Sequence, residues 1–158
     1  KDSMGNSYTL PAGEVQRMSA GSGVMHSEFN ASKTETLKFL QIWISPNKTG
    51  IEPSYEQMPI VQSGAMTPLV TPNGRDGSLS IQQDASLYRL HLEAGESYQL
   101  VAKDAEQRVG YLHVIEGGAL NDEKNLKAGD GLGIINDQLS ITACSEGIVA
   151  LWFDLPSN

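Results

Sequence analysis

The chain has 158 residues, which is enough to bury a hydrophobic core in one domain or in two small ones. Its 19 acidic residues outnumber 11 lysines and arginines, so the formal net charge is -8 and direct binding to nucleic-acid backbones is not expected. No apolar run reaches the roughly 18 residues of a membrane span, so membrane insertion is not expected either.

The single cysteine and the start of the chain bear on its compartment. Cys144 is the only cysteine, so an intrachain disulfide is impossible and a reducing compartment is favoured. It ends the short apolar run 141–144, where we predict a small core residue. No signal-peptide pattern opens the sequence, and we therefore expect a cytoplasmic protein.

A five-residue motif recurs three times along the chain. It consists of a leucine, a variable residue, alanine, glycine and an acidic residue, at Leu10–Glu14, Leu92–Glu96 and Leu126–Asp130. Glycine at the fourth place suits a tight turn that enters a strand, so each copy predicts such a turn. The copy at Leu10 has no partner copy nearby. We expect the first strand of its hairpin to lie outside this chain, which leaves the first of two modules incomplete.

A histidine and a glutamate stand two residues apart after the first of these turns. On a β-strand, side chains at i and i+2 share a face, so we expect His26 and Glu28 to point the same way. Imidazole and carboxylate suit a divalent first-row transition metal, although two ligands alone hold no such ion tightly. A lone histidine in a strand is more often structural, so the residues alone leave both interpretations open.

Short β-rich runs follow, separated by turns that contain glycine and proline. The run at 37–44 is apolar on both faces, as expected of a strand between a barrel interior and another layer. Further strands are predicted at 87–92, 97–101, 108–116, 138–143 and 148–155. No segment has a sustained helical period. The sequence therefore predicts an all-β protein built of barrels or sandwiches.

Proline is concentrated between the two predicted modules. Five of the seven prolines lie between Pro46 and Gly77. We interpret residues 51–72 as an extended connection, which leaves 1–50 as the end of a first module and 73–158 as a complete second module.

Several motifs together resemble the pirin family of bicupins, especially bacterial members that are similar to quercetin 2,3-dioxygenases. The resemblance covers essentially the whole chain. It is carried by Pro11-Ala12-Gly13, Met18-Ser19-Ala20-Gly21-x-Gly23, His26-Ser27-Glu28, Gln41-Ile42-Trp43-Ile44, Pro53-x-Tyr55-Glu56-Gln57, Asp76-Gly77-Ser78-Leu79 and Phe153-Asp154-Leu155-Pro156. It implies a bicupin fold of two β-barrel or jelly-roll modules, with the first barrel incomplete in this chain and the second free of metal.

The resemblance also implies an activity. Family members hold one divalent metal, such as Fe, Ni, Cu or Mn, through three histidines and a glutamate, of which the last histidine and the glutamate match His26 and Glu28. The other two histidines have no counterpart here, so metal is expected to be absent or weakly held and activity impaired. The implied function of the intact protein is dioxygenase cleavage of a flavonol, with Glu28 as a metal ligand and general base. Met18, Met25 and Phe29 are candidates to line the substrate pocket.

Two other functions compete with catalysis. Eukaryotic members of the family act as metal-dependent cofactors of transcription regulators, which implies a binding module for protein partners. The chain is alternatively an inert remnant, or a second chain completes its first barrel. The remaining histidines carry no metal prediction: His91 is expected at the surface or between the modules, and His113 is expected as a hydrogen-bonded residue of the barrel wall.

Overall fold

The structure is a computed structural model that describes residues 1–102, 108–121, 124–135 and 137–157. A small antiparallel sheet joins β1 (Glu14–Ser19) to β2 (Ser54–Pro59). A larger sheet has eight strands, which are β3 (Met66–Thr71), β4 (Leu79–Ser80), β5 (Ser86–Leu92), β6 (Ser97–Val101), β7 (Arg108–Leu120), β8 (Asn125–Lys127), β9 (Gly131–Ile135) and β10 (Gln138–Pro156). One 3₁₀ turn, η1 (Arg75–Gly77), precedes β4. The all-β prediction is therefore confirmed. Within the described ranges, no helix is long and apolar enough to cross a bilayer.

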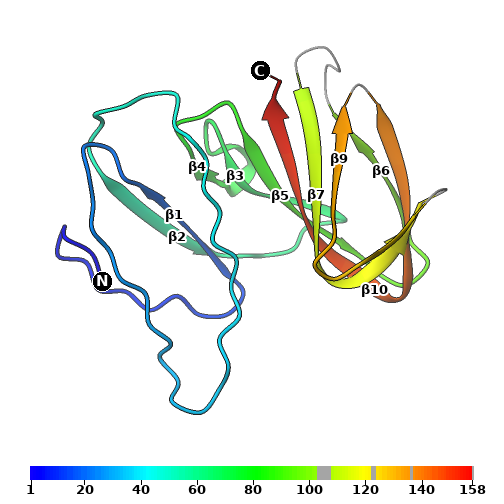
Figure 1. Ribbon diagram of the computed structural model, residues 1–158, viewed down its shortest axis with the longest axis horizontal. Coiled ribbons are helices and arrows are strands. Elements are labelled where there is room, and N and C mark those ends of the chain that lie inside the picture. The colour runs from blue at the N-terminus through cyan, green and yellow to red at the C-terminus, as the bar shows by residue number, and fades with distance from the viewer. Residues whose placement is uncertain (103–107, 122–123, 136, 158) are drawn as a thin grey trace.

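The eight strands of the larger sheet curl into a barrel around the long strand β10. The sheet runs β4-β3-β5-β10-β7-β8, while β6 pairs with β10 and β9 pairs with β7. Strand β10 is antiparallel to β5, β6 and β7 and bends between these partners (Figure 1). Its register against β7 shifts between Ala143 and Ile148, which is where a bulge lets one strand turn the corner of the barrel.

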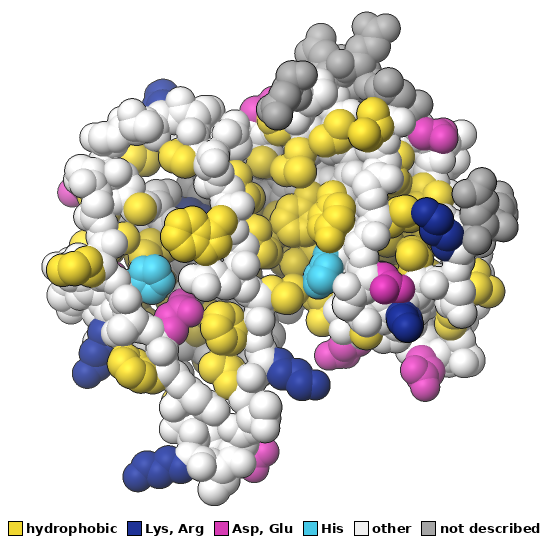
Figure 2. Space-filling model, in the orientation of Figure 1, with side chains coloured by type: hydrophobic (Ala, Val, Ile, Leu, Met, Phe, Trp, Pro, Cys, Tyr) yellow, Lys and Arg dark blue, Asp and Glu magenta, His cyan; other side chains and the backbone are white. Residues whose placement is uncertain are grey.

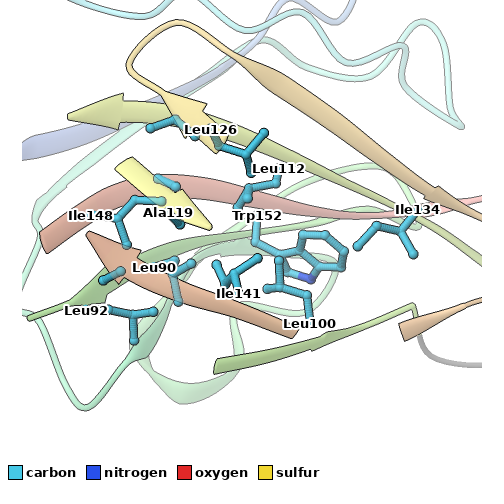
Figure 3. Packing of buried hydrophobic residues seen from close by; sticks show 13 residues of the cluster. Leu90, Leu92, Leu100, Leu112, Ala119, Leu126, Ile134, Ile141, Ile148 and Trp152 are labelled. Atoms are coloured by element: carbon cyan, nitrogen blue, oxygen red, sulfur yellow. The ribbon is translucent and has the colours of Figure 1, made fainter. Parts of the chain in front are cut away.

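The interior of the barrel is a closed hydrophobic core. Alternation along β7 buries Leu112 and Val114, whereas Tyr111 on the opposite face of the same strand remains exposed. Trp152 of β10 packs over Gly110, where a Cβ atom would collide with the indole ring, so this strand position requires glycine. Figure 3 shows how the core side chains converge from different strands, with labels on Leu90, Leu92, Leu100, Leu112, Ala119, Leu126, Ile134, Ile141, Ile148 and Trp152.

A second hydrophobic cluster joins the small sheet to the large one. Leu69, Leu87 and Leu151 are buried on the outer side of the barrel. Val15 of β1 and Met58 of β2 are partly buried against this cluster. One face of the small sheet therefore packs on the barrel, and its other face is left to carry different chemistry.

The three predicted turns share one geometry, which confirms the interpretation of the repeat. In each copy the acidic residue donates its backbone N–H to the carbonyl three residues earlier, at 3.3 Å for Glu14, 3.0 Å for Glu96 and 2.9 Å for Asp130. The preceding glycines, Gly13 and Gly95 and Gly129, have φ of 82°, 79° and 92°. A positive φ at the third position of a four-residue turn favours glycine, which explains why the motif keeps it.

The predicted strand at 37–44 is wrong, because this segment has irregular structure. Its side chains are open to solvent, with Phe39 58% exposed and Trp43 86% exposed. A strand needs a neighbour that accepts its backbone hydrogen bonds, and no described strand pairs with this segment. An apolar pattern indicates which side chains favour burial, but it does not supply that neighbour.

The proline-rich segment contains more regular structure than expected. Strands β2 and β3 both lie within residues 51–72, one in each sheet. Pro59 ends β2, and Pro68 stands at a register shift of β3, which are positions where a missing N–H is tolerated. Further along the chain, the two predicted strands at 138–143 and 148–155 are continuous in β10. Cys144 is half-buried rather than in the core, because alternation places Ala143 on the inner face instead.

Candidate functional site

The small sheet has two chemically different faces. The register sets Gln16 opposite Gln57 and Met18 opposite Tyr55, and period-two alternation places these four side chains on one face. Val15 and Met58 lie on the opposite face, against the barrel. The polar face is therefore oriented away from the barrel cluster and toward the segment that contains Glu28.

Glu28 is anchored to this polar face by one of its two carboxylate oxygens. The side-chain amide of Gln16 donates a hydrogen bond from Nε2 to Oε1 of Glu28 at 2.8 Å. The segment around Glu28 has no regular strand and the residue is exposed. Gln16 thus connects the candidate carboxylate to strand β1.

Tyr55 extends this contact across the sheet. Its hydroxyl lies 3.0 Å from Oε1 of Gln16 and 2.5 Å from Oε1 of Gln57. The ring of Tyr8 stacks on the Tyr55 ring, with centroids 5.1 Å apart and planes at 13°. Burial raises the pKa of Tyr55, and the negative charge of Glu14 raises it further, so the phenol remains a protonated donor.

The Glu14 carboxylate is the last member of this hydrogen-bond network, and it is available because the neighbouring turn contains a proline. In the other two copies of the turn motif, the acidic side chain accepts a hydrogen bond from the backbone N–H of the variable residue. Glu96 accepts from Glu93 at 2.8 Å, and Asp130 accepts from Lys127 at 2.9 Å. In the first copy the variable residue is Pro11, which has no N–H. The Glu14 carboxylate instead accepts a hydrogen bond from Nε2 of Gln57 at 2.9 Å.

The predicted metal ligand His26 lies two residues before Glu28 on the same extended segment and is exposed. Its backbone forms an isolated bridge with Asp2, and the N–H of Ser3 binds the carbonyl of Met25 at 2.8 Å. These contacts hold the segment against residues 1–6. Ligation of a metal by His26 and Glu28 stays a prediction.

The three predicted pocket residues differ in their surroundings. Met18 is half-buried on the polar face of the small sheet, beside Gln16 on the same strand. Met25 and Phe29 are each 78% exposed, and hydrophobic side chains are visible on this side of the molecule (Figure 2). Their role in a substrate pocket also stays a prediction.

The donor set can be compared with what a metal requires. An imidazole and a carboxylate are suitable ligands for a divalent transition metal. Gln16 binds Oε1 of Glu28, so the second carboxylate oxygen, Oε2, takes no part in that bond. Among the residues that the structure describes, no three histidine, cysteine, aspartate or glutamate side chains come together as a metal group. His26 and Glu28 therefore fit as part of a ligand set and do not complete one.

The remaining histidines have other surroundings. His91 lies with its Nε2 atom 3.8 Å from the carboxylate of Glu93 and is partly exposed. The ring of His113 stacks on Tyr111, with centroids 6.5 Å apart. Neither observation points to a metal.

Sequence reasoning missed the roles of Gln16, Tyr55 and Gln57. The spacing of two residues between Tyr55 and Gln57 predicts that they share a face of a strand. No local signal predicts that Gln16 lies beside them, because the Tyr55–Gln16 contact spans 39 residues.

Comparison with known proteins places both parts of the chain in one family. Residues 1–44 match the pirin model, and residues 68–155 match the model of the quercetinase C-terminal cupin domain. The chain is 43% identical over 157 residues to a quercetin 2,3-dioxygenase of Escherichia coli K12, covering 99% of this chain and 67% of that protein. It is also 36% identical over 155 residues to a putative quercetin 2,3-dioxygenase of Pasteurella multocida, covering 98% of this chain and 66% of that protein.

Solved structures agree with these sequence matches. The chain superimposes on YhhW from Escherichia coli with a TM-score of 0.92 at 39% identity, covering 100% of this chain and 67% of YhhW. The same bacterial pirin in complex with nickel(II) gives a TM-score of 0.90 at 38% identity, with coverage of 98% and 66%. The fold is thus of the cupin type, and the chain belongs to the pirin family.

Proposed function

We propose that the protein is a metal-dependent dioxygenase of the cupin class that cleaves flavonols, with His26 and Glu28 as two ligands of its metal. The hydrogen bonding of the Glu28 carboxylate carries this proposal. One carboxylate oxygen is held by Gln16, and the other is left for an ion or a proton, two residues from an exposed imidazole.

Two relatives support this choice of reaction and cofactor. The Escherichia coli relative is named quercetin 2,3-dioxygenase, and a bacterial pirin structure contains nickel(II). His26 and Glu28 offer ligand types that suit Fe, Ni, Cu and Mn, with the remaining ligands supplied from outside the described residues. Bound there, a divalent metal would stabilise the deprotonated, electron-rich form of a flavonol through its hydroxyl and carbonyl oxygens.

The side chains of this chain would have two tasks in that reaction. If the Glu28 carboxylate swung off the ion, its Oε2 atom would accept the flavonol hydroxyl proton as a general base. Met18, Met25 and Phe29 would contact the flat aromatic rings and exclude water from the reacting atoms. The net charge of -8 disfavours a nucleic-acid partner, and the single cysteine suits a cytoplasmic protein.

The test is flavonol consumption by the metal-loaded full-length protein. Glu28→Gln keeps the shape of the side chain but removes its charge and its capacity as a base. We expect kcat for quercetin, followed by loss of flavonol absorbance, to fall about 10²-fold or more while KM changes less. Wild-type turnover in this variant would refute the assignment.

The chain contains a matched control for that experiment. His91 and Glu93 have the same spacing as His26 and Glu28 but lie in the second module. We expect Glu93→Gln to leave quercetin turnover unchanged. We also expect His26→Ala to weaken nickel(II) binding, whereas His91→Ala leaves it at the wild-type value.

A further inference from the structure

We propose that Gln16 is the positioning residue for Glu28, and that Tyr55, Gln57 and Glu14 determine which way its amide faces. The inference rests on the proposed function, because it takes Glu28 to be a ligand. Its structural basis is a continuous row of side-chain contacts across the two strands of the small sheet.

The direction of the Gln16 amide follows from its two neighbours. A glutamine amide has one end that only donates and one end that only accepts. The Glu28 carboxylate accepts, so Nε2 of Gln16 faces it at 2.8 Å, and Oε1 then faces the Tyr55 hydroxyl at 3.0 Å. Rotation of the amide by 180° would place two oxygens against each other at Glu28, which is unfavourable.

The second glutamine is oriented by the same rule at the other end of the row. The Glu14 carboxylate accepts from Nε2 of Gln57 at 2.9 Å, so Oε1 of Gln57 also faces Tyr55, at 2.5 Å. Two carbonyl oxygens therefore converge on one phenolic O–H. Stacking of Tyr8 on the ring restricts the position of this hydroxyl.

Pro11 is the sequence feature that makes this arrangement available. An N–H at position 11 would compete for the Glu14 carboxylate, as the N–H groups of Glu93 and Lys127 bind Glu96 and Asp130 in the other two turns. Without that donor, Glu14 is available to Gln57. Pro11 thus acts, through Glu14 and the second strand, on Gln16, the side chain that binds the candidate ligand.

As a consequence, the Glu28 carboxylate has one oxygen available to bind a metal. Oε1 of Glu28 is occupied by Gln16, and Oε2 is left for the metal. Hydrogen-bonded neighbours of metal-ligating carboxylates typically change metal affinity or activity about 10-fold to 100-fold when removed. Gln16 acts on the metal only through Glu28, so metal affinity is the direct readout.

The experiment measures nickel(II) affinity of the full-length protein by isothermal titration calorimetry, with nickel(II) chloride as the probe. We expect Gln16→Leu to weaken binding about 10-fold or more. Tyr55→Phe removes only the hydroxyl, and we expect a smaller loss of about 3-fold, within the range of an outer hydrogen bond. Gln99→Leu, at an exposed position of β6, is the matched control and should retain wild-type affinity. Thermal unfolding of each variant establishes that it is folded.

A metal-free measurement tests the contact independently. The Gln16 side-chain amide should give a nitrogen-15 NMR signal that moves in Glu28→Ala and in Pro11→Ala. Wild-type nickel(II) affinity in folded Gln16→Leu, or an unmoved amide signal in Glu28→Ala, would overturn the inference. The proposed function fails separately if Gln16→Leu weakens nickel(II) binding but the loaded wild-type protein consumes no flavonol.

Discussion

The two sheets of this protein differ in how many strands cover the apolar side chains near them. In the eight-stranded sheet, Leu90 and Leu112 are fully buried because neighbouring strands cover both of their sides. Beside the two-stranded sheet, Phe29 is 78% exposed and Trp43 is 86% exposed. An apolar residue stabilises the fold only if other strands remove it from water, so the two regions should differ widely in stability.

The comparison extends to the two pairs of histidine and glutamate. His26/Glu28 and His91/Glu93 have identical spacing. Glu28 is bound by the amide of Gln16, whereas Glu93 faces His91 itself at 3.8 Å. Spacing along the chain is therefore not sufficient to define a site, and the neighbours on adjacent strands distinguish the two pairs.

The largest expected contrast between the two sheets is in amide hydrogen exchange. Opening free energies range from near zero in poorly covered segments to the global unfolding free energy in core strands. We expect amides in the middle of β10 to exchange at least about 10³-fold more slowly than those of β1. Exchange followed by NMR or mass spectrometry gives the ratio. Equal protection of β1 and β10 would mean that other protein surface covers the small sheet in solution.

Replacing the two tryptophans sharpens the same contrast. Trp152 is 4% exposed and Trp43 is 86% exposed. We expect Trp152→Ala to reduce the free energy of unfolding by about 3–5 kcal/mol, because it leaves a cavity in the core. Trp43→Ala should change it by less than about 0.5 kcal/mol. Denaturant titration measures both, and a large cost at Trp43 would break the comparison.

Arginine ion pairs provide a third contrast. Arg108 donates from Nε to Asp154 at 2.8 Å. Burial lowers the pKa of Arg108, but its hydrogen bonds and charge interactions with Asp154 and Asp84 together raise it above its ordinary value. The Asp154 side chain is 12% exposed. We expect Asp154→Asn to cost about 2 kcal/mol in unfolding free energy, since a charged hydrogen bond is lost from a largely buried site.

The corresponding pair of the small sheet joins Arg17 to Glu56. Arg17 is 10% exposed but Glu56 is 46% exposed, so solvent screens the carboxylate end of this interaction. We expect Glu56→Gln to cost only about 0.5 kcal/mol, as is usual for exposed ion pairs. A cost as large as that of Asp154→Asn, in the same denaturant experiment, would contradict the ranking.

The smallest expected effect is a pH dependence at Tyr55. The pKa of this phenol is raised above its ordinary value of 10.0, chiefly by burial and then by Glu14. Above pH 10 the unfolded chain loses this proton before the folded chain does, so stability that is complete below pH 10 falls as the pH rises. Tyr55→Phe should remove this contribution to alkaline destabilisation. Unfolding midpoints at several pH values measure the slope, and an unchanged slope would contradict the assignment.

The sequence was informative wherever the structure depends on adjacent residues. The turn at Gly13 was predictable because four residues and a positive φ define it, and the same holds for Gly95 and Gly129. Strand β5 was predictable at its observed bounds apart from one residue, because Leu90 and Leu92 alternate with His91 and a turn motif follows. The segment at 37–44 failed because its burial depends on a neighbouring strand that local pattern does not specify.

For the candidate site, the sequence by itself determined that an imidazole and a carboxylate lie two residues apart and that Pro11 lacks an N–H. Only the tertiary structure decided that Gln16 binds Glu28 and that Tyr55 connects Gln16 to Gln57. Turn geometry is local, so a few adjacent residues determine it. Hydrogen bonds across a sheet require two strands from distant parts of the chain to pair in one register, and a shift of one residue would turn Tyr55 to the opposite face.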